Sequence, residues 1–166
     1  MFWVNTLAAS PYVRSASRIA LYRRLGMDIS AEGTDIGPSC YIHSDDLRVG
    51  SHTTIKTRCW FENVGRLTIG DRVGVGPHTV ILTSTHELGS ARRRYGKWHY
   101  LPVTIGDGCW IGARTLIHPG VTVGHGCIVA AGSVVNRDTE PDCLYAGVPA
   151  RKIRHLDDAE SLPQRP

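Results

Sequence analysis

Residues 105–135 read IGDGCWIGARTLIHPGVTVGHGCIVAAGSVV, and every sixth position of this stretch holds an aliphatic side chain. The six positions are Ile105, Ile111, Ile117, Val123, Val129 and Val135. A period of six fits neither the 3.6 residues of a helical turn nor the two-residue alternation of a strand. It indicates a repeat in which each unit supplies one short strand and one corner. Three units per coil predict a triangular prism whose aliphatic residues stack inward.

The same register continues upstream of this stretch. Ile36 and Ile42 are six residues apart, and so are Val49 and Ile55, and then Ile69, Val75 and Ile81. The position four places after the aliphatic residue is small or β-branched, which suits a tight, flat strand with little room. This small slot holds Cys40, Thr53, Cys59, Val73, Thr79, Cys109, Thr115, Val121, Cys127 and Ser133. Four of the five cysteines are therefore interpreted as small core residues, and a reducing compartment is expected.

Length and composition narrow the class of protein. The chain has 166 residues, a formal net charge of +4 and 42% hydrophobic residues. These values are typical of a single globular domain. Its longest basic run is Arg92–Arg94, so bulk binding of nucleic acid is not indicated. Residues 1–13 are apolar but lack a leading positive charge and are interrupted well short of a membrane span, which predicts a cytoplasmic protein.

Three segments are expected. Residues 1–34 form an N-terminal cap with an amphipathic helix over 14–28, which places Arg18 in water and covers the open first coil. A basic helix could instead contact an anionic membrane surface. Residues 35–140 form the prism, with an inserted arm at 87–102 that contains no repeat unit; arms of this length are usually functional. Residues 141–166 form a closing segment and a polar tail.

One histidine is placed differently from the others. His86 stands where the last regular unit, ILTSTH, passes into the arm. A histidine at the base of a projecting loop can meet a ligand held between the prism and the arm. We therefore expect His86 to take part in the chemistry of the protein.

Several motifs together make a family resemblance specific. TSTHEL, IGDGCWIG, IHPGVTVG, AAGSVV and YAGVPARKIR resemble the hexapeptide-repeat acyltransferases of the galactoside, maltose and nodulation-factor type, and related polysaccharide O-acetyltransferases. The resemblance covers residues 36–156. It implies an all-β, left-handed parallel β-helix, which is an exception to the usual right-handed crossover. It also implies a homotrimer with active sites between neighbouring prisms.

The resemblance assigns roles to individual residues. It implies that His86 acts as general base and removes a proton from an acceptor hydroxyl that attacks the thioester of acetyl-CoA. The backbone N–H of Ala113 would stabilise the oxyanion. The residues implied to bind CoA are Trp110, Ala131, Asn136, Arg137, Arg151 and Arg154. Arginine suits phosphate, because it forms charge-assisted hydrogen bonds.

The acceptor is less well defined by the sequence. Lys56 stands where sugar-specific family members have an acceptor-binding asparagine, and Glu87 stands where a proline often follows the histidine. Glu62 and Asn63 lie in a break of the repeat at residues 60–67 and are further candidates for acceptor binding. Lys56, together with Arg93 and its basic neighbours in the arm, would suit an anionic sugar or glycan. A solvated basic arm explains the same residues equally well.

Three other functions compete with O-acetyl transfer to a sugar or glycan precursor. The acceptor could be an amine or a natural-product alcohol. A γ-carbonic-anhydrase-like metalloenzyme would begin its ligand set at His125, but it needs a second histidine where Ala130 stands, so no metal is expected. A non-catalytic scaffold would explain the repeat but not the arm or the basic ending.

Overall fold

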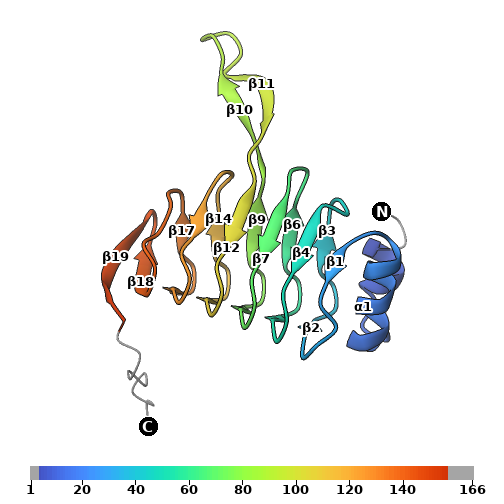
Figure 1. The fold of residues 1–166 in the computed structure, drawn as a ribbon. Helices are drawn as coiled ribbons and strands as arrows, with labels where there is room; N and C mark the ends of the chain where they lie inside the picture. Colours follow the sequence, from blue (N-terminus) through green and yellow to red (C-terminus); the bar gives the residue numbers. More distant parts are fainter. Residues whose placement is uncertain (1–3, 157–166) are drawn as a thin grey trace.

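The six-residue repeat folds into short strands that alternate with corners, and the strands stack into three sheets (Figure 1). The computed structural model describes residues 4–156. The first sheet contains β1 (Asp28–Ile29), β4 (Leu47–Val49), β7 (Leu67–Ile69), β12 (Val103–Ile105) and β15 (Thr122–Val123). The second contains β2 (Asp35–Ile36), β5 (Thr54–Ile55), β8 (Gly74–Val75), β13 (Trp110–Ile111), β16 (Ile128–Val129), β18 (Cys143–Gly147) and β19 (Ala150–His155). The third contains β3 (Tyr41–Ile42), β6 (Trp60–Glu62), β9 (Val80–Leu82), β14 (Leu116–Ile117) and β17 (Val134–Val135).

Successive coils pair in parallel and in the same register around the prism, which confirms the predicted parallel β-helix. The aliphatic residues at the repeat positions all point inward and are at most 1% exposed. The small slots are at most 3% exposed, and the cysteines among them are free thiols. Burying one such aliphatic side chain contributes about 1.5–3 kcal/mol, so the stack of coils supplies the core of the molecule.

Most corners contain a residue in the left-handed backbone region, just before the small slot. Glycine fills this position at Gly108, Gly126 and Gly132, where it adopts a positive φ without steric cost. Arg58 (φ 59°) and Arg114 (φ 59°) fill it elsewhere, so a side chain stands at the apex of those corners. We call the corner from the first to the second sheet the first corner, and the corner from the second to the third sheet the second corner.

The N-terminal segment covers the open edge of the first coil. It comprises the π-helix η1 (Val4–Ala8) and the helix α1 (Ser15–Arg24), which is shorter than expected from the sequence. At the edge strand β2, the N–H of Ile36 donates to Ser15 Oγ (3.0 Å); at β3, Asn5 exchanges two 2.9 Å hydrogen bonds with the backbone of Ile42. The cap thus satisfies backbone groups that would otherwise be unpaired. No helix in residues 4–156 is both long and apolar enough to cross a membrane.

The expectation that Arg18 lies in water is wrong, because this side chain is 2% exposed. Its guanidinium donates to the carbonyl oxygens of Ala8 (2.6 Å), Ile36 (2.6 Å), Ser10 (2.9 Å) and Val13 (2.7 Å). A guanidinium has five N–H donors, so one side chain can bind the edge strand, the end of η1 and the loop before α1 together. Arg18 is therefore a structural link between the cap and the prism.

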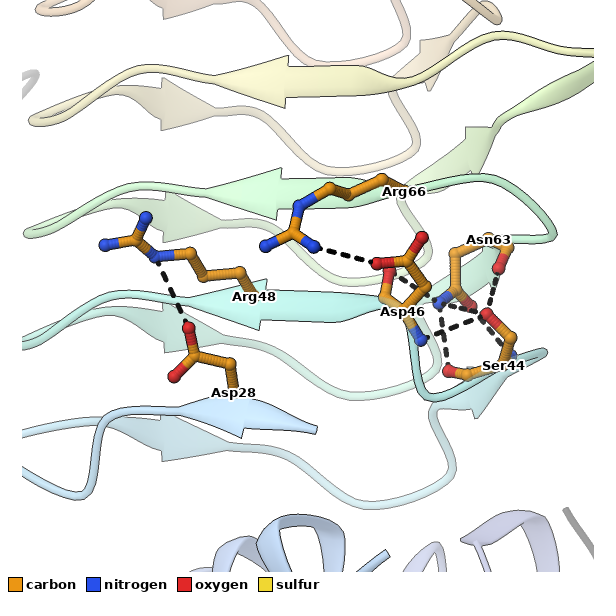
Figure 2. A network of polar contacts seen from close by, with 6 residues as sticks. All are labelled: Asp28, Ser44, Asp46, Arg48, Asn63 and Arg66. Carbon is orange, nitrogen blue, oxygen red and sulfur yellow. Dashed lines mark hydrogen bonds and ion pairs between the residues drawn. The ribbon is translucent and has the colours of Figure 1, made fainter. Parts of the chain in front are cut away.

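The break in the repeat after β6 contains a buried polar network, drawn in Figure 2. Asn63 is fully buried; its Oδ1 accepts from the N–H groups of His43 (2.9 Å) and Ser44 (3.2 Å), and its Nδ2 donates to the Ser44 carbonyl (3.0 Å). Nearby, Arg66 in the loop after β6 pairs at 3.1 Å with Asp46 in the loop after β3 (Figure 2). The amide of Asn63 therefore joins the loop after β6 to the loop after β3, so Asn63 stabilises this part of the fold.

The other end of the prism is closed by two strands. β18 adds to β16 in parallel, and β19 folds back antiparallel on β18. Figure 1 places the cap and this closing pair at opposite ends of the molecule, with the arm projecting from the middle. The predicted polar tail at 157–166 lies outside the described residues, as do residues 1–3.

Candidate functional site

The arm is a β-hairpin that leaves the prism after β9 and returns at β12 (Figure 1). Its strands are β10 (Ser84–Leu88) and β11 (Tyr95–Tyr100), which pair antiparallel with Ser84 opposite Tyr100 and His86 opposite Trp98. Directly opposite residues share one face of a hairpin. His86, Ser84, Trp98 and Tyr100 therefore line the same face. The aromatic residues at 98 and 100 alternate with polar ones, and this period of two was a strand signal that the sequence interpretation missed.

The imidazole of His86 is held by its own hairpin. Nδ1 lies 3.0 Å from the carbonyl oxygen of Gly96. The indole of Trp98 is nearly parallel to the imidazole, with ring centroids 5.9 Å apart, and Tyr95 meets it edge-on at 5.3 Å. A carbonyl only accepts, so the tautomer that satisfies this contact carries its proton on Nδ1. Nε2 then keeps a lone pair that can accept a proton.

A second group of expected residues gathers at the end of the second sheet, beside the second corner. Lys56, Gly74 and Trp110 line a hollow of about 90 Å³, together with Thr54, Val75 and Gly76. The indole of Trp110 is half exposed and lies beside Gly74, where a Cβ would be 3.7 Å from Cδ1 of the ring. This hollow brings together one residue expected to bind the acceptor and one expected to bind CoA.

The backbone of the second corner supplies two free donors next to this hollow. Within residues 4–156, no hydrogen bond uses the N–H of Ala113 or of Ala131. Glycine stands against each of them: a Cβ on Gly76 would be 2.5 Å from the Ala113 nitrogen, and a Cβ on Gly112 would be 2.4 Å from the Ala131 nitrogen. The coils can stack this closely only because these two positions have no side chain.

One chain does not bring His86 and Ala113 together. Val80 pairs with Leu116, while Ala113 precedes Leu116 by three residues and His86 lies beyond the end of β9. The two residues therefore lie beyond opposite ends of parallel strands, roughly 15 Å or more apart at about 3.3 Å per residue. Within the described residues, no hydrogen bond, ion pair or ring contact joins them.

The remaining residues expected to bind CoA lie at the closing end of the prism. Asn136 and Arg137 follow β17 and are exposed, and Arg151 and Arg154 lie on β19. Leu144 of β18 pairs with Arg154, so β19 is the edge strand of the second sheet, which also contains Trp110. The Arg151 guanidinium donates to the carbonyl of Ala150 (2.9 Å) and is otherwise exposed.

The four residues proposed for acceptor binding fall in different places. Lys56 lines the hollow, whereas Glu62 lies near the base of the arm and accepts from Ser84 Oγ at 2.7 Å. Arg93 lies at the tip of the arm, with its guanidinium 4.7 Å from the centre of the Tyr95 ring. Asn63 is buried and fully engaged in the network of Figure 2, so its side chain is not free to contact an acceptor.

His125, at which the ligand set of a metalloenzyme would begin, contacts a carboxylate. His125 Nε2 lies 3.4 Å from Asp142 Oδ2 at the first corner. Within residues 4–156, no three His, Cys, Asp or Glu side chains are grouped so that they could hold a metal ion.

Comparison with known proteins finds hexapeptide-repeat proteins and acetyltransferases as relatives. A family model described as the hexapeptide repeat of succinyl-transferase matches residues 102–137. The galactoside O-acetyltransferase of Escherichia coli K12 is 38% identical over 123 residues, which cover 74% of this chain and 61% of that protein. The chain spans about 60% of the length of the first curated relatives it matches.

Two solved structures extend the likeness to most of the chain. A hexapeptide-repeat-containing acetyltransferase from Vibrio cholerae, complexed with acetyl coenzyme A, is 35% identical and superposes with a TM-score of 0.82 over 95% of this chain and 83% of that one. A maltose O-acetyltransferase from Clostridium difficile is 28% identical, with a TM-score of 0.84 over 93% and 83% of the two chains.

Proposed function

Because this chain belongs to the hexapeptide-repeat acetyltransferase family, we propose that it transfers an acetyl group from acetyl-CoA to a hydroxyl group of a sugar or glycan precursor. The observation that carries the proposal is the fixed imidazole of His86, whose Nδ1 contacts the Gly96 carbonyl. This contact supports a role for Nε2 as the proton acceptor in general base catalysis. The saccharide acceptor is supported by the relatives named galactoside and maltose O-acetyltransferases.

The reaction needs no covalent enzyme intermediate. The acceptor hydroxyl oxygen attacks the thioester carbonyl carbon while Nε2 of His86 takes the hydroxyl proton. The N–H of Ala113 donates to the oxyanion of the tetrahedral intermediate, a contribution of about 3–4 kcal/mol in comparable enzymes. The C–S bond then breaks, the ester forms, and the imidazolium returns its proton to the CoA sulfur.

Acetyl-CoA would lie along the second corner and on toward the closing strands. Trp110 offers an apolar wall for the pantetheine arm, and the free N–H of Ala131 offers it a donor. Arg137, Arg151 and Arg154 lie at that end of the prism and are the residues that we propose bind the CoA phosphates. The proposed mechanism uses no metal.

A complete site requires a second copy of the chain, because His86 and Ala113 lie on different edges of one prism. The outward positions of the third sheet are apolar, namely Tyr41, Trp60, Val80, Leu116 and Val134. The outward positions of the first sheet are polar, namely Asp28, Arg48, Thr68, Thr104 and Thr122. An apolar sheet face supports self-association, and a trimer closes three such contacts by rotation.

The test is an acetyl-transfer assay in which released CoA thiol is measured and the product is identified by mass spectrometry. We expect ester formation with at least one saccharide and a loss of about 10²-fold or more for His86→Gln. His99→Gln is the matched control, because His99 lies on the same hairpin and pairs with Glu87 at 2.7 Å. An amide product in place of an ester would assign the enzyme to amine acceptors, and unaffected turnover in His86→Gln would refute the proposed base.

A further inference from the structure

Four side chains form a basic ridge along the second corner, which we define as Lys56, Arg58, His78 and Arg114. All four are exposed. Arg58, His78 and Arg114 occupy the same left-handed position in three successive coils, with φ of 59°, 61° and 59°. These coils pair in register, Trp60 with Val80 and Val80 with Leu116, so their backbones are about 4.8 Å apart. The ridge is therefore a continuous line of donors.

The ridge has no acidic partner within the described residues. Its corner segments read GPSC (37–40), KTRC (56–59), GPHT (76–79), GART (112–115) and AAGS (130–133), without an aspartate or glutamate. No ion pair in residues 4–156 involves any of the four ridge residues. The lysine and arginine charges of the ridge lie near one another without a counter-charge from residues 4–156, and an anion bound along the ridge would offset their repulsion.

The first corner of the same prism provides an internal comparison. His52 and Arg72 occupy the equivalent left-handed position there, and both are paired: His52 with Glu32 at 3.6 Å and Arg72 with Asp107 at 3.9 Å. The two corners share their backbone geometry but differ in charge balance. Within residues 4–156, the basic side chains at these turns thus have carboxylate neighbours at the first corner and none at the second.

The size and charge of the side chains along the second corner change at Ala113. On the side of the closing strands, the next coil presents Ala130, Ala131 and Gly132, which are small and uncharged and leave room for an extended thioester arm. On the side of the cap lie the ridge residues, with Lys56 in the hollow beside Trp110. The donor half and the acceptor half of the corner are therefore chemically distinct.

We infer that the acceptor carries a negative charge, and that the ridge binds its carboxylate or phosphate group while its hydroxyl reaches the thioester beside Ala113. This inference rests on the proposed acetyl transfer and deepens it by naming the class of acceptor. The same side chains could bind the phosphates of CoA, so the experiment must distinguish binding of an anionic acceptor from binding of CoA.

The experiment compares methyl β-D-glucuronide with its uronamide, which has the same hydroxyl groups but no charge. We expect wild-type kcat/KM to favour the glucuronide by about tenfold or more, as one charge-assisted contact provides, and Arg58→Gln to remove most of that preference. We expect the KM for acetyl-CoA to be the same in Arg58→Gln as in the wild type. Arg72→Gln is the control, because it removes the same side chain from the same backbone position at the neutralised first corner.

Two results would overturn the inference while the enzyme remains an acetyltransferase. Equal use of the glucuronide and the uronamide is one, and a rise in the KM for acetyl-CoA in Arg58→Gln, with acceptor preference unchanged, is the other. If neither glycoside is acetylated, calorimetric titration with trigalacturonate tests whether the ridge binds an anionic saccharide. Binding that Arg58→Gln weakens and Arg72→Gln preserves supports the ridge even if transfer to sugars fails, whereas no binding overturns it.

Discussion

The Nδ1 atom of His86 lies 3.0 Å from the carbonyl oxygen of Gly96, on the opposite strand of the same hairpin. The position of Gly96 depends on its missing side chain, because a Cβ there would be 2.9 Å from the Glu87 carbonyl oxygen. Gly96→Ala must therefore shift the backbone that orients the imidazole. Small misplacement of a catalytic group is costly, so we expect kcat to fall about 10- to 100-fold.

The stability of the Gly96→Ala variant separates this effect from unfolding. The arm projects from the prism, so we expect the free energy of unfolding to change by less than about 0.5 kcal/mol, measured by urea denaturation. Lys97→Ala is the control, since Lys97 is the adjacent exposed residue and leaves the Gly96 carbonyl in place. A normal kcat in Gly96→Ala would show that the carbonyl contact does not position the base.

Close stacking of the coils at the second corner predicts a sharp difference between two neighbouring glycines. A Cβ on Gly76 would meet the Ala113 nitrogen at 2.5 Å, whereas a Cβ on Gly74 would meet only the Trp110 ring at 3.7 Å. We expect Gly76→Ala to destabilise the fold by about 2–4 kcal/mol, because backbone must move, and Gly74→Ala to change stability by about 0.5 kcal/mol or less. Urea denaturation of both variants checks this, and equal effects would contradict it.

The sequence predicted the interior of the prism because one rule applies to every coil. Ile105, Ile111 and their equivalents recur every six residues, and a periodic pattern over many coils specifies both the inward face and the stacking. The role expected for Ala113, by contrast, came from the family resemblance and not from the periodicity. The glycines that bring Ala113 and Ala131 into close contact with neighbouring coils belong to that register as well.

The features that the sequence did not predict lie where the repeat is interrupted. Arg18 lies on a short helix whose exposed and buried faces depend on how it docks onto the edge strand, and no periodicity describes that docking. Asn63 lies in the corner after β6, where eight residues instead of six separate Phe61 from Ile69. The contacts of His86 arise from the hairpin pairing with Trp98, which joins two strands outside the six-residue register.

The buried guanidinium of Arg18 predicts a large loss of stability when it is removed. Arg18→Met deletes hydrogen bonds to four carbonyl oxygens, including that of Ile36 on the edge strand. We expect a loss of about 3–5 kcal/mol in the free energy of unfolding. Arg23→Met on the exposed side of the same helix is expected to cost about 0.5 kcal/mol or less. Similar losses for the two variants would show that Arg18 is not a structural link.

Tyr22 packs against the same region and predicts an alkaline effect on stability. Its side chain is fully buried, its hydroxyl has no hydrogen-bond partner in residues 4–156, and burial raises the pKa of its phenol well above the usual value. The folded state thus keeps the proton that the unfolded chain releases near pH 10, so stability falls as the pH rises above about 10.

Tyr22→Phe removes that proton linkage and an unpaired polar group. At pH 7 we expect the variant to be as stable as the wild type or more stable by up to about 1 kcal/mol. Above about pH 10 its advantage should grow, because the variant has no phenol at this position that folding must hold protonated. Urea midpoints measured between about pH 7 and 11 check this. A constant difference between the two proteins across that range would contradict the buried, protonated phenol.

The division of the proposed site between two prism edges predicts complementation between inactive variants. His86→Gln loses the base, and Trp110→Ala loses the wall of the hollow, so each variant alone should be strongly impaired. Unfolding and refolding the two together produces mixed assemblies, in which a copy with an intact arm faces a copy with an intact corner. In a randomly mixed trimer, about a quarter of the sites would be complete.

Recovery of about a quarter of wild-type activity in the mixture, measured by CoA release, would place His86 and Trp110 of one site on different chains. The same experiment with Leu116→Asp added to both variants should give no recovery, because a charge on the apolar third sheet prevents association; light scattering then reports a monomer. Thr104→Asp, on the polar first sheet, should leave both the assembly and the recovery unchanged. Failure of the mixture to exceed the activity of its components, with assembly intact, would mean that each chain builds its own site.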